Sequence, residues 1–344
     1  MDKAIKRRDS ALNFLKLLCA YLVDNNIEIK DVEIPKINDG EVLIKIKYAL
    51  TDGTDLKAYL RSHHLLKNGP FGHEYSGIVV ESKSHKFKIG DEVFGLNSAY
   101  CGNCKFCKTN RENLCLSLKD NLVLGAYAEY LKIPKLVVEK NLFIKPREIS
   151  FKVAPIIEPL ACVFSGIEKL NLSGYENIII LGSSSIAIMF FLILENFNVK
   201  IYSRSKKRLE LLKESPLFEK LERAFIYEID NNYDVLIDTT GSYDLINKVL
   251  NNPPRGSKIL LFSGMEGDKF LTFNQSYFHY NEIDILTSFH HKPSSVKKAY
   301  DFLMEKHKLL EYLITFEFEI KDIKKAFELM KEGKALKCAL KFEK

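Results

Sequence analysis

The sequence contains no apolar run of about 20 residues, the length that a helix needs to cross a membrane. Residues 11–23 are mostly apolar, but Asn13 and Lys16 interrupt them and no clear small-residue cleavage site follows, so we do not expect a signal peptide. The net charge is only +6 over 344 residues, and basic and acidic side chains are interspersed. Such a surface lacks the concentrated basic patch of a nucleic-acid-binding protein. We therefore expect neither a membrane nor a nucleic acid as a partner.

Four of the seven cysteines lie in one short polar loop, at Cys101, Cys104, Cys107 and Cys115. A disulfide pair or a redox Cys-x-x-Cys motif would each leave thiols over. Four thiolates can instead surround one tetrahedral ion, and a set with no histidine and no obvious open position is typical of a structural zinc site. The other three cysteines are scattered, and unpaired thiols in such a chain suggest a reducing, cytoplasmic compartment.

A second group of possible metal ligands lies at the two ends of residues 51–77. Asp52 provides a carboxylate near the beginning, and His73 and Glu74 provide an imidazole and another carboxylate near the end. Nitrogen and oxygen donors of this kind bind zinc where one position must stay open for a substrate. The alternative is that Asp52 closes a turn through its side chain and that Gly72-His73 is an ordinary loop.

Short alternating segments predict a β-rich first part of the chain with long irregular loops. The first dozen residues are expected to form an extension or a short helix. A largely apolar helix is expected from Ile156 to about Leu170, and Glu158 within it needs a partner because a buried lone carboxylate is costly. A capping or salt-bridge role for Glu158 is the alternative to metal binding. The expected strands are Leu17–Val23, Glu41–Lys47, Ile78–Glu81, Asp91–Gly95 and Leu136–Glu139.

From Asn177 the pattern predicts a doubly wound nucleotide-binding unit of alternating strands and helices. The turn at Gly182–Ala187 matches Gly-x-Gly-x-x-Gly/Ala, except that Ser184 replaces the middle glycine, which normally lets the backbone approach a pyrophosphate. Ser184 either crowds the phosphate or bonds to it through its hydroxyl. A helix is expected after the turn, at Ile188–Glu195. The expected strands are Ile178–Leu181, Val199–Tyr202, Val235–Asp238, Lys258–Phe262 and Ile283–Leu286.

The end of the second of these strands bears on the choice of nicotinamide cofactor. An acidic residue at this position binds the two ribose hydroxyls of NAD, but residues 203–208 contain no carboxylate. Ser203, Arg204 and Arg208 instead suit a 2′-phosphate, because arginine forms charge-assisted and often bidentate bonds to phosphate. The alternative is a basic helix N-terminus exposed to water. We favour NADP(H) over NAD(H).

Taken in order, these motifs resemble the zinc-containing medium-chain alcohol/polyol dehydrogenase family. The resemblance covers nearly everything after Cys19. The cysteine loop and the Gly-His-Glu segment are motifs specific to this family, whereas the Gly-rich turn occurs in many nucleotide-binding proteins. Two positions depart from the family pattern. Asp52 stands where the family usually has a zinc-binding cysteine, and Lys57 stands where many members have a histidine that relays protons. The matching segments are Asp52-Gly53-Thr54-Asp55, Gly72-His73-Glu74, the four-cysteine loop, Glu158-Pro159-Leu160 and Gly182–Ala187.

The resemblance implies an α/β fold, in which a β-rich GroES-like catalytic domain is joined to a Rossmann-type doubly wound parallel-sheet domain. It implies a catalytic, zinc-binding domain at residues 1–157, a nucleotide-binding domain at 158–290, and a return to the catalytic domain at 291–344. The return is expected to contain helices at Ser295–Lys306 and Ile323–Met330 and a closing strand at Ala335–Phe342. A homodimer or homotetramer is also implied.

The resemblance further implies two zinc ions per chain, one structural in the cysteine loop and one catalytic. Asp52, His73 and Glu158 would hold the catalytic ion, and Glu74 would either support these ligands or exchange with one of them. Thr54 would carry the alcohol proton away. The implied contacts to NADP(H) or NAD(H) are Gly182, Ser184, Ser185, Ile186, Ser203, Arg204, Arg208 and Thr240.

The expected activity is zinc-dependent hydride transfer between a secondary alcohol and a nicotinamide ring. A polyol, sugar or cyclitol is the leading substrate class, and a simple secondary alcohol or aldehyde is the alternative. An alternative of another class is a non-catalytic zinc-lobe protein that binds a partner. Because oxygen is a harder donor than sulfur, Asp52 should hold zinc less tightly than a cysteine would, which predicts a labile catalytic metal beside a tightly held structural one.

Overall fold

The structure is a computed structural model that describes residues 16–61, 66, 68–265, 267 and 269–342. The extension or helix expected for the first dozen residues lies outside this range. The described residues form two compact units. Unit 1 contains the residues up to Glu158 and those from Leu303 onwards, and unit 2 is Pro159–Phe302. The domain boundaries implied by the family resemblance stay a prediction.

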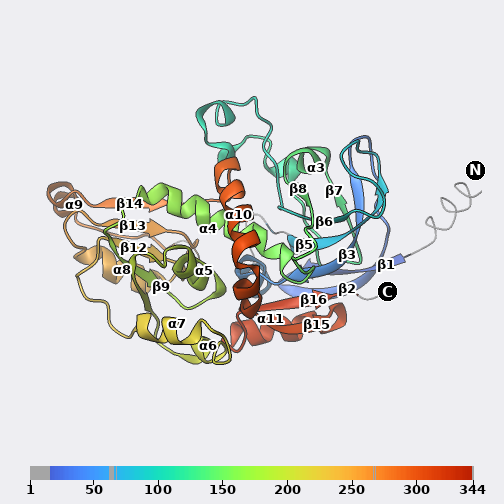
Figure 1. The fold of residues 1–344 in the computed structure, drawn as a ribbon. Helices are drawn as coiled ribbons and strands as arrows, with labels where there is room; N and C mark the ends of the chain where they lie inside the picture. The colour runs from blue at the N-terminus through green and yellow to red at the C-terminus, as the bar shows by residue number, and fades with distance from the viewer. Residues whose placement is uncertain (1–15, 62–65, 67, 266, 268, 343–344) are drawn as a thin grey trace, which may run out of the picture. The chain divides into compact units, whose positions relative to one another are not determined.

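Unit 1 is built on a large mixed sheet, drawn at the right of Figure 1. Its strands follow the order β15-β16-β3-β5-β6-β8, and β7 pairs with β3 beside this path. The strands β3 and β5 pair antiparallel, and β16 from the end of the chain pairs antiparallel with the other edge of β3. The strands are β3 (Val42–Leu50), β5 (Glu74–Ser82), β6 (Glu92–Gly95), β7 (Tyr130–Ile133), β8 (Leu142–Ile144), β15 (Ile314–Glu319) and β16 (Lys337–Lys341).

A smaller sheet and several short helices complete unit 1. The small sheet has the order β2-β1-β4, from β1 (Lys16–Val23), β2 (Asn26–Glu33) and β4 (Gly69–Pro70). The core between the strands and helices is apolar and includes Phe71, Tyr127 and Phe327, whose rings contact one another. The helices are α2 (Gly53–Arg61), α3 (Lys135–Lys140), α11 (Ile323–Lys331), the last turns of α10 (Pro293–Leu310) and six short 3₁₀ turns among the described residues, of which η4 (Ala154–Ile156) leads into α4 (Ile157–Leu170).

The predicted strand at Leu136–Glu139 is wrong, because these residues lie in helix α3. Four apolar or mixed residues are too few for periodicity to separate a strand from a helix. Pro134 caps the helix with an extended conformation, and its carbonyl accepts bonds from the amides of Val137 and Val138. A proline at this position costs the helix no hydrogen bond, since the first amides of a helix have no partner within it.

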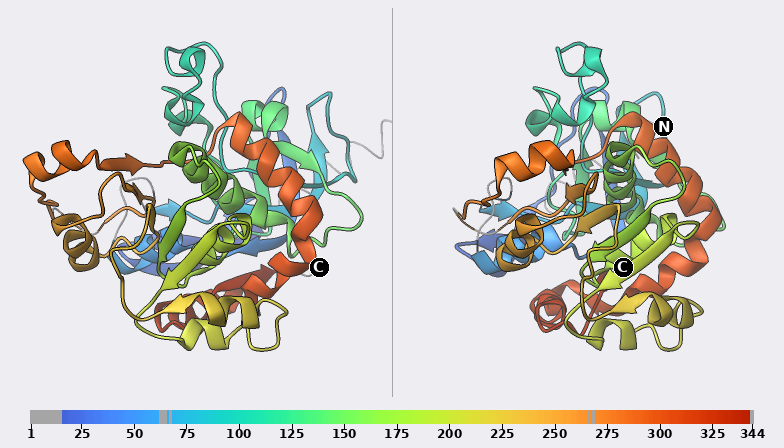
Figure 2. Two further views of the ribbon diagram at one scale, coloured as in Figure 1. Left: turned by 60° about the vertical axis from the view of Figure 1, so that its left-hand side comes forward. Right: turned by 90° about the vertical axis from the view of Figure 1, so that its left-hand side faces the viewer.

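Unit 2 is built on six parallel strands in the order β11-β10-β9-β12-β13-β14. This is the doubly wound order 3-2-1-4-5-6, in which ligands bind where the strand order reverses, at the carboxyl ends of the strands. The predicted α/β fold class is therefore confirmed, and Figures 1 and 2 show the helices that connect consecutive strands. The strands are β9 (Asn177–Leu181), β10 (Asn198–Tyr202), β11 (Phe225–Ile226), β12 (Val235–Asp238), β13 (Lys258–Leu261) and β14 (Asp284–Thr287).

Helices connect the parallel strands of unit 2, except between β11 and β12, where residues 227–234 contain no helix. They are most of α4, then α5 (Ser185–Ile193), α6 (Lys207–Glu210), α7 (Phe218–Ala224), α8 (Tyr243–Asn251), α9 (Gln275–Asn281) and the first turns of α10. Helix α5 begins three residues earlier than the sequence predicts, because the Ser184 hydroxyl accepts a bond from the amide of Ala187 and caps the helix.

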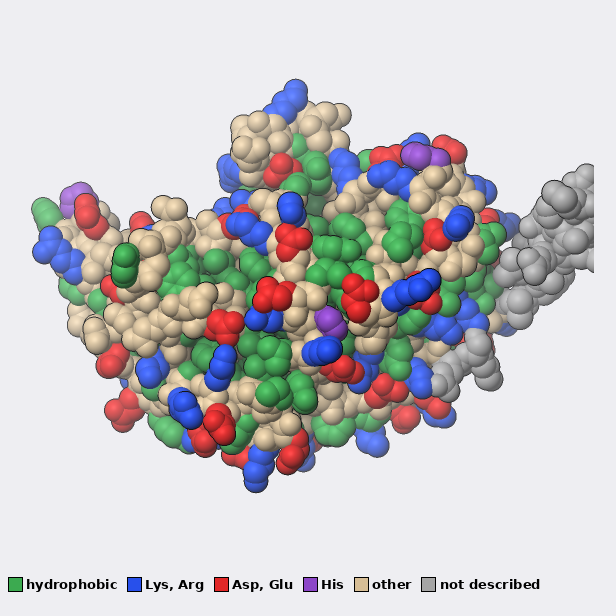
Figure 3. Space-filling view, viewed as in Figure 1, with side chains coloured by type: hydrophobic (Ala, Val, Ile, Leu, Met, Phe, Trp, Pro, Cys, Tyr) green, Lys and Arg blue, Asp and Glu red, His purple; other side chains and the backbone are tan. Residues whose placement is uncertain are grey.

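The surface carries both charge signs over the face that Figure 3 shows, with Lys and Arg side chains placed among Asp and Glu. No helix within the described ranges is long and apolar enough to span a membrane.

Candidate functional site

The first candidate site forms at the edge where β3 ends and β5 begins. The register of this antiparallel pair places Leu50 opposite Glu74, so Asp52, just after β3, comes next to His73, just before β5. Glu158 arrives from the first turn of α4, where a carboxylate is favoured by the helix dipole. Residues that are far apart in the sequence therefore meet within unit 1.

His73 stands between the two predicted carboxylate ligands. Its Nε2 atom lies 3.9 Å from Oδ2 of Asp52 and 3.9 Å from Oε2 of Glu158. All three side chains are buried. Tetrahedral zinc with bonds of about 2.0–2.1 Å needs donor atoms about 3.3 Å apart. The structure brings one oxygen of Asp52 and one of Glu158 to the same nitrogen of His73, and ligand atoms of His73, Glu74 and Glu158 lie within 4.8 Å of one another. Imidazole and carboxylate donors of this kind fit a catalytic zinc site.

The His73 ring is held from its other nitrogen. Nδ1 of His73 lies 3.2 Å from Oδ1 of Asp55, and the Tyr127 hydroxyl donates to Oδ2 of the same carboxylate. Asp55 and Tyr127 are fully buried. A carboxylate on Nδ1 fixes the ring orientation and leaves Nε2 to face a metal. Gly72 allows this packing, because its φ is +89° and a Cβ atom there would lie 2.7 Å from the Tyr127 ring.

Glu74 is paired with a buried lysine that the sequence analysis did not identify. The Lys337 ammonium of β16 lies 2.6 Å and 2.8 Å from the two carboxylate oxygens of Glu74 and donates to the Thr51 carbonyl at 2.8 Å. Burial raises the pKa of Glu74, and the Lys337 charge opposes that rise. Burial alone would lower the pKa of Lys337, but Glu74 and Asp52 outweigh it and raise that pKa. The short contacts are those of an ion pair.

The site carries an excess of negative charge. Four carboxylates are buried around His73, namely those of Asp52, Asp55, Glu74 and Glu158, and Lys337 is the one buried lysine that pairs with them among the described residues. Burial favours the neutral form of Asp52, yet Lys337, His73 and the amide and hydroxyl of Thr54 lower its pKa to about 2. Buried charges require partners. An ionised Asp52 among these buried carboxylates provides a donor suited to a divalent cation.

Protonation of His73 is expected to compete with metal binding. Burial alone would lower the pKa of this ring, but Asp55, Glu158 and Asp52 outweigh it and raise the pKa well above its ordinary value. Below that raised pKa the ring carries a proton that a metal must displace. The apparent zinc affinity should therefore keep rising with pH above the ordinary pKa of histidine, by up to about tenfold per pH unit, with up to about one proton released per ion.

Chelator competition at several pH values would measure this slope, on protein whose cysteine loop keeps its metal. The variant His85→Asn, at an exposed loop position, serves as the control and should leave the slope unchanged. An affinity that does not change over this pH range would contradict the expectation.

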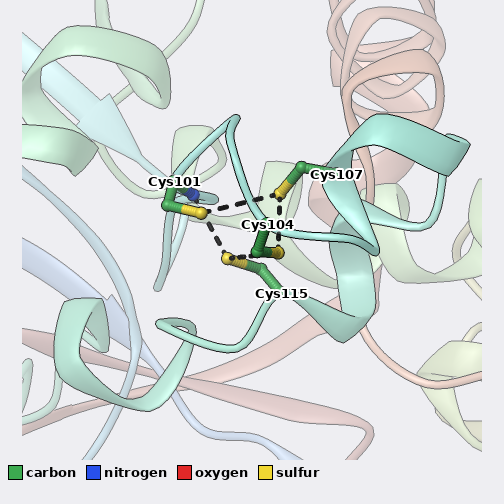
Figure 4. A group of neighbouring side chains, drawn as sticks. All are labelled: Cys101, Cys104, Cys107 and Cys115. Atoms are coloured by element: carbon green, nitrogen blue, oxygen red, sulfur yellow. Dashed lines mark hydrogen bonds between the residues drawn. The ribbon is translucent and has the colours of Figure 1, made fainter.

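The four cysteines of the loop converge in a small lobe that projects from unit 1, drawn in teal in Figures 1 and 2 and in detail in Figure 4. The sulfur of Cys107 lies 3.9 Å from that of Cys101 and 3.5 Å from that of Cys104, and Cys104 lies 4.0 Å from Cys115. Four sulfurs bound to one zinc at about 2.3 Å would be about 3.8 Å apart. The thiols are all free, and their spacing fits a tetrahedral ion.

The predicted cofactor contacts gather at the carboxyl ends of the central strands of unit 2. Gly182 follows β9 with φ +107°, and a Cβ atom there would lie 2.7 Å from the hydroxyl oxygen of Thr239. Ser183 and Ser203, after β9 and β10, have hydroxyl oxygens 3.1 Å apart. The Thr240 hydroxyl bonds to Asp238 at 2.6 Å. Ser185 and Ile186 lie in the first turn of α5, and Arg204 and Arg208 lie in the turn after β10 and in α6.

The sequence analysis assigned no role to three residues of the first site, and two of them carry a weak sequence signal. Asp55 lies one helical turn after Asp52 in the same motif, so its place could have been inferred. Lys337 is a charged residue within the apolar segment Leu336–Leu340, a pattern that indicates a buried partner. Tyr127 has no local signal, because its hydroxyl reaches Asp55 across 72 residues of sequence.

Comparison with known proteins places the chain among dehydrogenases. Residues 38–141 match the alcohol dehydrogenase GroES-like domain family. The chain is 28% identical to the L-threonine 3-dehydrogenase of Aliivibrio fischeri (strain MJ11) over 354 residues, covering 96% of this chain and 99% of the relative.

Two solved structures share the whole fold. The L-idonate 5-dehydrogenase of Escherichia coli has a TM-score of 0.79 and 19% identity, covering 95% of this chain and 99% of the other. The 2R,3R-butanediol dehydrogenase of Bacillus subtilis has a TM-score of 0.77 and 19% identity, covering 95% and 100%. The motifs, the fold of the two units and these relatives agree in their similarity to the zinc-containing medium-chain alcohol dehydrogenases, and they support an NAD(P)-dependent dehydrogenase of this kind.

Proposed function

We propose that the protein transfers a hydride between NADP(H) and a secondary alcohol whose neighbouring carbon carries a polar group, with polyols, sugars and cyclitols as the leading class. The names of three relatives support this: threonine, idonate and butanediol are all secondary alcohols with an amine or hydroxyl on an adjacent carbon. The GroES-like match and the threonine 3-dehydrogenase relatives favour an enzyme over a non-catalytic zinc-lobe protein.

The observation that carries the proposal is the buried convergence of Asp52, His73 and Glu158, in which Nε2 of His73 faces one oxygen of each carboxylate. These three residues would hold the catalytic zinc. A bound zinc supplies a Lewis acid that lowers the pKa of a substrate hydroxyl. Glu158 is preferred to Glu74 as the third ligand, because the Lys337 ammonium already neutralises the charge of Glu74.

The protein's own groups position the ligands and accept the proton. Asp55 and Tyr127 orient the His73 ring from behind, and the Thr54 amide donates to Oδ2 of Asp52 at 2.6 Å. The Thr54 hydroxyl interacts with the same carboxylate and is half-buried, so it links the site to the outer part of α2. Thr54 would thus receive the proton of the alcohol and pass it outward.

A substrate panel tests the proposal. Threonine, 2,3-butanediol, several polyols and sugar acids, and isopropanol as a simple secondary alcohol would each be offered with NADP and with NAD, and reduced cofactor would be followed by its absorbance. The expected result is turnover of substrates with a polar neighbour, and faster turnover with NADP. Preference for isopropanol would favour the simple secondary-alcohol alternative, and the absence of both turnover and NADPH binding would overturn the proposal.

The preference for NADP(H) rests on the turn after β10. This turn offers hydroxyls and guanidinium groups and no carboxylate, and Arg204 is exposed at its tip. Arg208 is half-buried in α6, and burial lowers its pKa while leaving it far above neutrality. Lys206 is partly neutralised by Glu222 at 3.5 Å. We therefore expect the exposed guanidinium of Arg204 to make the main contact with a 2′-phosphate.

Replacing Arg204 with alanine should raise KM for NADP about 10- to 100-fold, because a charge-assisted bond to phosphate contributes about 1.5–3 kcal/mol. The KM for NAD should change less than about twofold, since NAD lacks the phosphate. Steady-state kinetics with both cofactors measure the ratio. Arg223→Ala is the matched control, because Arg223 is exposed on α7 and pairs with Glu219. Equal effects on NADP and NAD would contradict the assignment.

A further inference from the structure

The two proposed metal sites of the chain differ in their donor atoms. The lobe offers the sulfurs of four cysteines, whereas Asp52, His73 and Glu158 offer oxygen and nitrogen. Peroxides oxidise the sulfur of a cysteine thiolate, and the catalytic donor set contains no sulfur. A cysteine in place of Asp52, as the zinc-containing medium-chain dehydrogenases usually have, would bring an oxidisable atom into both sites. The two sites of this chain should therefore respond differently to a peroxide.

The thiols outside the lobe are poorly placed to react. All seven cysteines lie within the described residues, and two of those outside the lobe, Cys19 and Cys338, are 3% and 0% exposed. Their thiols donate to the carbonyls of Ala20 and Ala326. Burial raises the pKa of both thiols to about 12, so they keep their protons at neutral pH and are weak nucleophiles. The remaining thiol outside the lobe is that of Cys162, which is half-buried on α4.

The lobe places an accessible thiol beside a buried one. Cys104 is half-buried, Cys107 is buried, and their sulfurs lie 3.5 Å apart, as Figure 4 shows. The sulfurs of Cys101 and Cys107 are 3.9 Å apart, and those of Cys104 and Cys115 are 4.0 Å apart. A disulfide bond is about 2.0 Å long, so of these pairs Cys104 and Cys107 need the smallest movement to form one.

Oxidation of Cys104 and Cys107 by hydrogen peroxide takes two steps. The Cys104 thiolate attacks one peroxide oxygen: an S–O bond forms, the O–O bond breaks, and hydroxide leaves and takes a proton from the solvent. The Cys107 thiolate then attacks the Cys104 sulfur: the S–S bond forms, the S–O bond breaks, and a second hydroxide leaves and is protonated. The two sulfurs lose two electrons, and the peroxide gains them and becomes two water molecules.

A disulfide between Cys104 and Cys107 removes two of the four ligands of the lobe zinc, because zinc is bound by thiolates. The two remaining sulfurs, of Cys101 and Cys115, do not complete a tetrahedral site. The lobe relies on the ion for its fold, since its cluster of buried hydrophobic residues consists of two cysteines and Leu118. Loss of the zinc should therefore open the lobe.

We propose that the lobe is a peroxide-sensitive switch: oxidation joins Cys104 to Cys107, releases the lobe zinc and opens the lobe, while Asp52, His73 and Glu158 keep the catalytic ion. The second half of this inference rests on the proposed function, because it assumes that these three residues hold the catalytic ion. Asp52 thus has a consequence beyond metal affinity, since it confines oxidation to the lobe.

Zinc retention after exposure to hydrogen peroxide tests the inference on the protein loaded with zinc. The samples are wild type, Asp52→Cys, Cys104→Ser and Cys162→Ala, each beside an unexposed sample that corrects for spontaneous loss of zinc. Catalase stops the reaction, rapid desalting removes released zinc, and elemental analysis gives the zinc that stays bound. Peptide mass analysis locates disulfides, and limited proteolysis between Cys101 and Asn121 reports opening of the lobe.

Wild type should lose one zinc per chain, gain the Cys104–Cys107 disulfide and be cleaved in the lobe at least about tenfold faster. A thiol reductant with added zinc should reverse all three changes. Cys162→Ala should behave as wild type does. Cys104→Ser, which begins without lobe zinc, should keep the zinc it has, and this identifies the ion that resists the peroxide.

Asp52→Cys should lose both ions, because the peroxide then also oxidises a thiolate ligand at the catalytic site. Its second zinc should leave at least about tenfold faster than the second zinc of wild type. If Asp52→Cys binds no second zinc, wild type and Cys104→Ser decide the question, since both carry the native catalytic donors.

Three results would overturn the inference and leave the proposed function intact: wild type that keeps both ions in peroxide, wild type that loses both, or Asp52→Cys that loses only the lobe zinc. Slower release of lobe zinc from Cys162→Ala would also overturn it, by showing that Cys162 takes part. Unexposed wild type with zinc in the lobe alone would overturn the proposed function and the second half of the inference. The lobe disulfide and the loss of lobe zinc would still decide the first half.

Discussion

Replacement of Asp52 with alanine is expected to lower kcat/KM by about a thousandfold or more. Asp52 is buried and ionised, and its Oδ2 faces the same point as Nε2 of His73, so its loss removes a proposed ligand of the catalytic ion. A metal that stabilises charge in the transition state contributes several kcal/mol, which corresponds to about this factor. Steady-state kinetics and zinc content should show one fewer zinc per chain and an unchanged circular dichroism spectrum.

Two further variants separate a ligand role from a packing role for Asp52. Asp31→Ala, at an exposed position of β2, is the matched control and should keep both activity and metal. Asp52→Cys restores the donor usual in the family and should hold zinc more tightly, because sulfur is the softer ligand. Dialysis against a chelator should then remove the catalytic zinc from wild type before that of Asp52→Cys. Retained activity in Asp52→Ala would remove this residue from the site.

Loss of one thiol from the cysteine lobe should unfold the lobe while most of the protein stays folded. The lobe has little core of its own: its cluster of buried hydrophobic residues is Cys107, Cys115 and Leu118, and two of these are thiols. Structural zinc contributes about 10–16 kcal/mol in small peptides that have no other core. Cys104→Ser should therefore lose the lobe zinc and lower the free energy of unfolding of the lobe by about 5 kcal/mol or more.

Limited proteolysis with zinc analysis measures this effect. Cleavage between Cys101 and Asn121 should become at least about tenfold faster, because opening of the lobe limits cleavage there. Cys19→Ala is the matched control, since Cys19 is a buried thiol of β1 outside the lobe. Equal protease resistance in Cys104→Ser and wild type would show that the lobe folds without its metal.

Sequence patterns predicted the parts of the fold whose signals are local. Five of the six strands of unit 2 were predicted as short, nearly continuous apolar segments such as Ile178–Leu181, because parallel strands are buried on both faces. The two-residue strand β11 (Phe225–Ile226) is too short to give such a signal and was not predicted. The same reasoning failed at Leu136–Glu139, where the apolar segment is too short to show a period and Pro134 begins a helix instead. It also placed the beginning of α5 three residues too late, since the capping role of Ser184 was not recognised.

The candidate site was predicted less completely than the fold. Asp52, His73 and Glu158 belong to recognisable motifs, and the structure brings them together. The same structure surrounds them with Asp55, Tyr127 and Lys337, for which the sequence analysis proposed no role. Whether the three predicted residues hold a metal stays a prediction, and the variants above are designed to decide it.

By itself, the sequence determined the grouping of four thiols in one loop and five of the six strands of unit 2, because those features depend on spacings of a few residues along one segment. Only the tertiary structure decided that Lys337 pairs with Glu74 and lies near Asp52. These contacts depend on the β16-β3-β5 pairing, and a contact between residues 263 positions apart leaves no periodic pattern in the chain.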